Sequence, residues 1–419
     1  MLALFKVFLV FATVVFLIRK KVPLGISLVS GAILVAILFK MDISAGAAAF
    51  LDICIQADTR SFVLLIALAL ALSMVLEKSG QIDRLTESLR QFVTSRKLAS
   101  AMLPAIVGFL PMPGGALFSA PMVEAATSDL PIDNDKKVEI NHWFRHIWEY
   151  FWPLYPGVIY TANLLNLEVK KFSGLQFPIT IMAIISGFIF VMRRVRVPPK
   201  AVLDMTSSGS IAVLKFIVNL SPFLLIFVLY LLVNIPLLLS LACVLFLTSA
   251  LNIIFKKTKF LHLVRSIFTS AGFLNFLVMA YGVKLFGGIL SKSGAIYEMS
   301  IFFVNSHLPV LLIVILFPLI IGFVAGITIV YCSATFPLIL ALPDVTANPI
   351  PYIVLAFTAG FSGTMLSPIH ACLSLTNQYF CARLTKVILH LILPCSVSSL
   401  QVLLSIYSIP IGSRFEYKV

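Results

Sequence analysis

Residues 110–121 interrupt an apolar stretch that extends from 98 to 127, and they read Leu110-Pro111-Met112-Pro113-Gly114-Gly115-Ala116-Leu117-Phe118-Ser119-Ala120-Pro121. The first two prolines remove backbone donors and end a helix, and the Gly pair permits a turn with positive φ. Polar backbone at membrane depth is costly unless it faces protein or a water-filled cavity. We therefore expect two half-helices that meet at a tip lining a cavity, with the second directing free N–H groups toward an anion.

The composition of the chain excludes a soluble globular protein. Of its 419 residues, 60% are hydrophobic and 11% charged, whereas soluble domains carry about a quarter charged residues. A bilayer core of roughly 30 Å needs about 20 apolar residues per helix. On that basis hydropathy predicts ten spans, at 2–18, 24–40, 60–77, 147–165, 174–192, 211–233, 235–255, 268–290, 352–380 and 387–409. The stretch 309–341 is interrupted in the same way as 98–127, around Gly322 to Thr328.

The basic residues lie in short clusters between the apolar runs, and the net charge is +14. If both interrupted stretches return to the side they entered, one side holds 22 of the 31 Lys and Arg, in 19–21, 78–97, 128–146, 193–215, 256–265 and 383–386. Because cations collect on the cytoplasmic side, this sorting predicts re-entrant hairpins and a multi-pass protein of the cytoplasmic membrane with external termini. Nucleic acid, which needs a basic polar face, is not an expected partner.

Short identities recur at an offset of 214 residues. Lys78-Ser79-Gly80 with Ile82 recurs as Lys292-Ser293-Gly294 with Ile296, and Gly108-Phe109, Ser119-Ala120 and Asn163 recur as Gly322-Phe323, Ser333-Ala334 and Asn377. The pattern predicts two units, 1–205 and 206–419, each with five spans and one re-entrant hairpin, at about 98–127 and about 309–341. Because five is odd, the units would be inverted. The expected fold is an all-α polytopic membrane protein of two inverted repeats, an architecture found in secondary transporters.

Each hairpin is followed by a span that Pro and Gly interrupt. The first span reads Trp152-Pro153-Leu154-Tyr155-Pro156-Gly157, then Thr161-Ala162-Asn163, and the second reads Gly363-Thr364-Met365-Leu366-Ser367-Pro368-Ile369-His370, then Thr376-Asn377. Two tips and two broken helices that meet at mid-membrane would form one pseudo-symmetric site. The expected substrate-binding residues are Pro113, Gly114, Gly115, Ser119, Pro156, Asn163, Gly326, Thr328, Ser367, Pro368, His370 and Asn377.

The strings LPMPGGALFSAPMVE (110–124) and GTMLSPIHACLSLTNQYF (363–380) resemble the two signature regions of a prokaryotic membrane family, domain of unknown function 401 (DUF401). The resemblance extends over the whole chain. That family is grouped with the ion transporter superfamily of gluconate permeases, citrate transporters and dicarboxylate/sodium symporters. The resemblance therefore implies a secondary carrier of organic anions. The Ser-Asn-Thr hairpin motif of the dicarboxylate/sodium symporters is missing, so carboxylate binding in that manner is not implied.

Three ionisable residues within or beside the spans each have two interpretations. His370 follows the Ser-Pro break, and it either binds substrate or a coupling proton, or is a neutral histidine bonded to a carbonyl. Glu149 is either a coupling carboxylate or a residue in interfacial water. Lys284 either holds an anion or extends its charge to the interface, and the second interpretation is favoured.

His142, His146 and Glu149 share one helical face at the spacing i, i+4 and i+7, as a metal site would require. The segment also holds the three tryptophans of the chain, Trp143, Trp148 and Trp152, and tryptophan is enriched at membrane interfaces. Without a further histidine-rich segment to supply ligands, a belt at the membrane border explains the segment with fewer assumptions. We therefore expect neither a metal nor a catalytic residue.

These features predict a secondary transporter and not an enzyme. The expected substrate is a small polar solute, with an organic anion favoured, and the expected coupling ion is a proton or sodium. No GxxxxGK[ST] motif for a nucleotide is present. A channel and a membrane-embedded metalloenzyme are the alternatives. The expected partners are the lipid bilayer and the small-molecule substrate. Oligomers are common in the superfamily, and a homodimer is left open.

Overall fold

The computed structural model describes residues 2–93, 95–111, 115–193, 195–196, 209–254, 265–306 and 308–408. These residues form helices joined by short connections, with no β-strand among them. Within the described ranges, seven segments are long and apolar enough to cross a membrane: Leu2–Arg19, Ala57–Lys78, Val169–Val191, Ile211–Leu232, Leu237–Ile254, Ala271–Lys292 and Pro349–Phe380. The prediction of a helical multi-pass membrane protein is confirmed at this level.

The helices correspond closely to the predicted spans. Seven of the ten predicted spans match the seven long segments, and the spans 24–40 and 387–409 match shorter or less uniformly apolar helices. The elements are α1 (Leu2–Arg19), α2 (Leu24–Leu38), α3 (Ile43–Ile55), α4 (Ala57–Lys78), α5 (Gln81–Phe92), α6 (Arg96–Val107), α7 (Gly115–Thr127), α8 (Asn134–His146), η1 (Ile147–Tyr150), α9 (Pro156–Leu164), α10 (Val169–Ser186), η2 (Gly187–Val191), α11 (Gly209–Phe227), η3 (Val228–Leu232), α12 (Leu237–Ile254), α14 (Ala271–Lys292), α15 (Ala295–Asn305), α16 (Val310–Ala325), α17 (Thr328–Leu340), α18 (Pro343–Thr346), α19 (Pro349–Leu366), α20 (Ala371–Phe380) and α21 (Leu384–Ser408).

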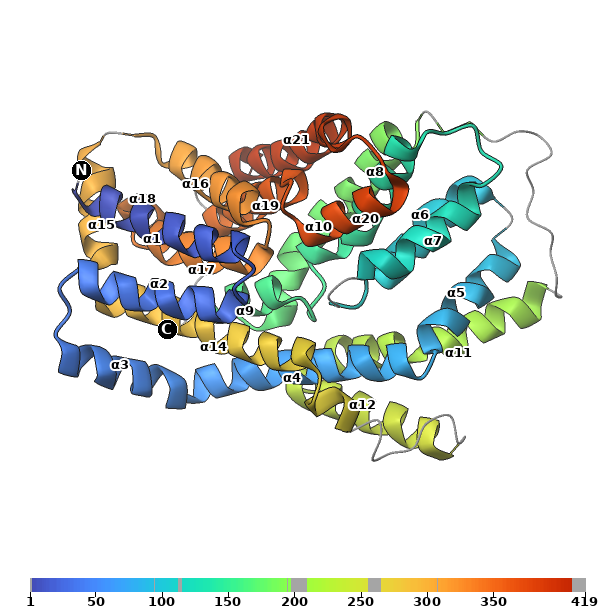
Figure 1. Ribbon diagram of the computed structural model, residues 1–419, viewed down its shortest axis with the longest axis horizontal. Coiled ribbons are helices and arrows are strands. Elements are labelled where there is room, and N and C mark those ends of the chain that lie inside the picture. Colours follow the sequence, from blue (N-terminus) through green and yellow to red (C-terminus); the bar gives the residue numbers. More distant parts are fainter. Residues whose placement is uncertain are drawn as a thin grey trace.

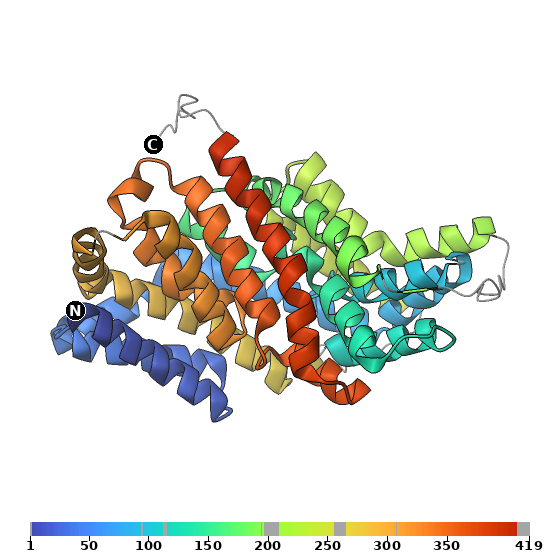
Figure 2. The same cartoon turned by 90° about the horizontal axis from the view of Figure 1, so that it is seen from above.

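The helices pack in two layers (Figure 1). One layer contains α6, α7, α8, α10 and α16 to α21, the other contains α2 to α5, α11, α12 and α14, and α9 lies between them. Helices from the two halves of the chain pack on each other, since α2 contacts α14, α12 contacts α4, α17 contacts α9 and α20 contacts α7. Helix α21 crosses the first layer with α19 on one side and α8 and α10 on the other (Figure 2).

Both interrupted stretches are pairs of helices that pack against each other, α6 with α7 and α16 with α17. In the second pair, α16 ends at Ala325 and α17 begins at Thr328; Gly326, which caps α16, has a φ of +66° in the left-handed region that favours glycine. In the first pair, α6 ends at Val107 and α7 begins at Gly115. Pro113 and Gly114, two of the predicted site residues, lie outside the described residues.

The second broken span has the predicted form, because α19 ends at Leu366 and α20 begins at Ala371. The first is also broken, but its predicted bounds, 147–165, are wrong. Helix α8, a 3₁₀ turn at Ile147–Tyr150 and α9 make one interrupted segment that begins at Asn134. Hydropathy missed α8 because its sequence, NDKKVEINHWFRH, is polar, although every residue from Asp135 to His146 is buried among neighbouring helices. Arg145, counted above among the cytoplasmic cations, is only 3% exposed.

The predicted tryptophan belt is also wrong. Trp143 and Trp152 are 2% and 4% exposed, and Trp148 is partly buried. Trp143 Nε1 donates to the carbonyl of Ala183 at 2.9 Å, and the Trp148 ring stacks on Phe109 at 4.4 Å between centroids. The segment therefore lies inside the bundle, and its histidines face protein and not headgroups.

The packing of α16 on α19 depends on glycine. A Cβ at Gly322 would lie 2.1 Å from the carbonyl oxygen of Gly360, and a Cβ at Gly363 would lie 2.1 Å from that of Leu319. Small residues allow helix backbones to approach this closely in membrane proteins. These close contacts fix the position of α16 along α19, and therefore the position of the turn at Gly326.

We expect Gly322→Ala to destabilise the protein by about 1–3 kcal/mol, the cost of overpacking a filled interior. The matched control is Gly174→Ala on α10, where an added Cβ meets nothing within 4 Å and where alanine should stabilise the helix by about 0.5–1 kcal/mol. The measurement is the melting temperature in detergent. Equal melting temperatures for the two variants would contradict the proposed role of the close contacts between α16 and α19.

Candidate functional site

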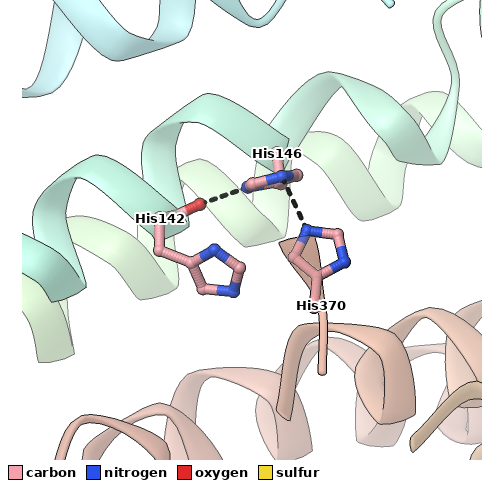
Figure 3. A group of neighbouring side chains, drawn as sticks. All are labelled: His142, His146 and His370. Atoms are coloured by element: carbon pink, nitrogen blue, oxygen red, sulfur yellow. Dashed lines mark hydrogen bonds between the residues drawn. The ribbon is translucent and has the colours of Figure 1, made fainter. Parts of the chain in front are cut away.

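Three histidines from the two broken segments converge between the helices (Figure 3). His142 and His146 lie one turn apart on α8, and His370 lies immediately before α20. All three are buried. One ring nitrogen of each lies within 4.8 Å of the others, and Nε2 of His146 is 3.1 Å from Nε2 of His370.

Each histidine also contacts a backbone carbonyl. His142 Nε2 lies 3.0 Å from the oxygen of Met365, His146 Nδ1 lies 2.6 Å from that of His142, and His370 Nδ1 lies 2.7 Å from that of Gly326. A carbonyl can only accept, so these three ring nitrogens carry the hydrogen. The carbonyls therefore fix the tautomer and the orientation of all three rings.

Arg145 and Glu149 place a cation and a carboxylate beside the histidines. Arg145 Nη1 lies 3.2 Å from His146 Nε2 and donates to Cys372 Sγ at 3.1 Å. Glu149 Oε1 lies 3.7 Å from His146 Nε2, and its Oε2 accepts from the Thr328 hydroxyl at 3.1 Å. Because burying charge inside a membrane protein is expensive, such groups usually serve function.

The turn of the second hairpin contacts the interruption of each broken segment. A Cβ at Gly326 would be 3.0 Å from the backbone nitrogen of His370 and from the Ser367 hydroxyl. A Cβ at Gly157 would be 2.7 Å from the Thr328 side chain. The beginnings of α9, α17 and α20 therefore meet at this site, and helix N-termini carry partial positive charge.

A family model described as "Protein of unknown function (DUF401)" matches residues 1–409. The chain belongs to the DUF401 family. The match includes both hairpins and both broken segments, so the resemblance of 110–124 and 363–380 to this family is confirmed. No curated protein matches the chain. Because the family's description names no activity, the function of this DUF401 protein has to be argued from its geometry.

The structure brings several predicted site residues of the DUF401 chain together. Gly326 lies against Ser367 and His370, and Thr328 bonds to Glu149. Pro156 begins α9 at the first break, and Pro368 lies in the second break with its ring exposed.

Gly115 and Ser119 lie buried on α7, which packs on α20, and the Ser119 hydroxyl bonds to the Gly115 carbonyl of its own helix. Asn377 lies half-buried on α20.

Asn163 lies at a different place, seven residues along α9 from Pro156 and so about 10 Å away by helical rise. It lines a cavity of about 260 Å³ together with Asp58 and Lys284. Lys284 bonds to both Asp58 and Asn163. Lys284 therefore forms an ion pair between α14 and α4, whereas the sequence favoured a side chain that reaches the interface.

Arg145 and Cys372 were not predicted from the sequence, and His142 and His146 entered only the metalloenzyme alternative. A signal was present, since His142, Arg145, His146 and Glu149 follow the spacing i, i+3, i+4 and i+7, which is typical of one helical face. The third histidine is 224 residues from His146. Only the packing of α20 on α8 brings it within reach.

We expect Thr328→Val to destabilise the protein by about 1–3 kcal/mol, because the buried Glu149 carboxylate would lose the Thr328 donor. Thr335→Val on the same helix is the matched control, since the buried Thr335 hydroxyl donates only to the Tyr331 carbonyl one turn earlier. Thermal unfolding in detergent compares the two variants. An equal loss in both would show that Glu149 does not depend on the Thr328 hydroxyl.

Proposed function

We propose that this protein is a secondary transporter that moves a small organic anion across the cytoplasmic membrane, driven by a proton or sodium gradient. The observation that carries the proposal is the meeting of two broken segments and a hairpin turn around the buried Arg145. Interrupted helices with a binding site at their breaks are typical of secondary transporters. Non-helical backbone at membrane depth is tolerated where it lines a site.

The proposal includes two inverted repeats, and the helix bounds support it. Helices α4 and α14 begin at Ala57 and Ala271 and end at Lys78 and Lys292, so both ends differ by 214 residues. Each helix is followed by a glycine in the left-handed region, Gly80 and Gly294. The crossed contacts between halves support a pseudo-two-fold arrangement, because α2 packs on α14 as α12 packs on α4. In this arrangement α6 with α7 and α16 with α17 are the re-entrant hairpins.

Inversion places the ends of α4 and α14 on opposite sides of the membrane. In a background without native cysteines, we expect Lys292→Cys to react with a membrane-impermeant maleimide in intact cells and Lys78→Cys to react only after permeabilisation. Both lysines are exposed at equivalent helix ends, so each variant is the control for the other. Labelling of both from the same side would contradict the inverted repeat.

The charges at the site favour an anionic substrate. The Arg145 guanidinium is fully buried, and a guanidinium recognises carboxylate with two parallel N–H donors. The beginnings of α9, α17 and α20 add partial positive charge at the same point. Glu149 balances Arg145 when substrate is absent, which reduces the cost of burying the cation.

We expect an organic anion at 100 times its dissociation constant to stabilise the detergent-purified protein by about 2.7 kcal/mol. Arg145→Lys should abolish this stabilisation, because lysine keeps the charge but loses the planar pair of donors. Arg19→Lys is the control, since Arg19 is exposed at the end of α1, away from the broken segments. The screen covers organic acids, sugar acids and amino acids, with and without sodium.

Uptake into proteoliposomes completes this test. We expect saturable uptake of the stabilising anion that follows an imposed proton or sodium gradient, and the gradient that drives it identifies the coupling ion. Uptake that does not saturate would indicate a channel instead. Absence of both ligand stabilisation and gradient-driven uptake would refute the proposed function.

A further inference from the structure

We propose that His142, His146 and His370 form a binding site for a divalent transition-metal cation of the kind that imidazole nitrogens prefer, such as Zn²⁺, Ni²⁺ or Co²⁺. This site goes beyond the proposed transport of an anion. It rests on the geometry of the three rings and does not require transport.

The hydrogen bonds of the rings leave three nitrogens for a cation. Because His146 and His370 donate through Nδ1 to carbonyls, their Nε2 atoms carry lone pairs when the rings are neutral. His142 donates through Nε2, so its lone pair is on Nδ1. Ligating histidines in metalloproteins usually donate their second nitrogen to a carbonyl or carboxylate in this way, which orients the ring.

The position of His142 favours a bound metal over a proton shared between two of the histidines. A proton held between His146 and His370, whose Nε2 atoms are 3.1 Å apart, would satisfy these two rings. It would leave His142 Nδ1 without a partner, and this buried atom has none within the described part of the chain. Leaving a buried polar atom unpaired costs about 1–3 kcal/mol. A cation satisfies all three nitrogens.

The distances fit a metal after a small adjustment. Bonds of 2.0–2.1 Å from zinc to histidine nitrogen separate two tetrahedral ligand atoms by about 3.3 Å. His146 Nε2 and His370 Nε2 lie 3.1 Å apart, and one ring nitrogen of each of the three histidines lies within 4.8 Å of the others. A shift of the His142 ring by about 1.5 Å would bring the widest separation to this spacing and complete the set. The three ligands leave a fourth position open, which is typical of sites that exchange a ligand.

The neighbouring charges determine how strongly the cation is held. The Glu149 carboxylate, 3.7 Å from His146 Nε2, offers a negative charge beside the site. The Arg145 guanidinium opposes a cation, and its hydrogen bond to His146 Nε2 must break when the metal enters. Arg145 then keeps its contact with Cys372. We therefore expect weaker and more exchangeable binding than at a structural zinc site.

The test measures metal binding to the full chain, purified in detergent with a tag that contains no histidine and stripped with a chelator. Equilibrium dialysis against Zn²⁺, Ni²⁺ or Co²⁺, followed by elemental analysis, should give one cation per chain. His142→Asn, His146→Gln and His370→Gln should each weaken binding at least tenfold. The control is His390→Gln, because His390 also lies on an apolar helix but bonds to Glu139 and takes no part in the cluster.

A spectroscopic measurement on the wild-type chain keeps the proposal testable if a variant does not fold. Co²⁺ bound to imidazole should give d–d absorption bands that Zn²⁺ displaces. Absence of stoichiometric binding to the wild-type chain would overturn the proposal and favour the shared proton. Unchanged binding in all three cluster variants would also overturn it. Because neither assay uses an organic anion or a gradient, failure of the transport proposal would be distinguishable from failure of this one.

Discussion

The hydrogen bond from His370 Nδ1 to the carbonyl of Gly326 joins the turn of the second hairpin to the break of the second interrupted span. Both segments interrupt a helix, and the backbone groups at a helix end lack partners within the helix. Each break therefore needs a polar partner from the protein. The His370 side chain supplies this partner for the Gly326 carbonyl, and the Thr328 hydroxyl connects the same hairpin to Glu149 beside the first break. The polar groups of the site therefore have a structural role, because they hydrogen-bond to groups at the helix interruptions, as well as a role in the proposed ligand binding.

Helix α8 can carry His142, Arg145 and His146 into the interior because other polar residues along it are paired with neighbouring groups. Asp133 accepts from the backbone nitrogen of Lys136 at the start of the helix, and the nearby Lys386 ammonium lowers the pKa of the Asp133 carboxyl. Asp135 pairs with Arg383, and Asn141 donates to Thr376 on α20. Buried ion pairs contribute little net stability. They do connect α8 to α20 and α21, and this connection positions the histidines.

Hydropathy, proline and glycine predicted most of the fold from the sequence. They located nearly every long helix, and the Gly326 turn and the Ser367-Pro368 break were recognisable because these residues restrict or relax the backbone directly. The same reasoning failed for α8, since a polar helix inside a bundle and a cytoplasmic loop have the same composition. The histidine cluster was equally out of reach. Its third member comes from a distant segment, and only tertiary packing shows that His370 faces His146.

The site is asymmetric although the helix bounds repeat. The positions 214 residues after His142, Arg145, His146 and Glu149 are Ala356, Ala359, Gly360 and Gly363 on α19. There the small side chains let α16 approach the backbone, with a Cβ at Gly363 only 2.1 Å from the Leu319 carbonyl. Close backbone packing and inward ionisable side chains exclude each other at one helix face, because both need the same volume. At these positions α19 provides the close packing that holds the second hairpin in place, whereas α8 carries His142, Arg145 and His146 into the site.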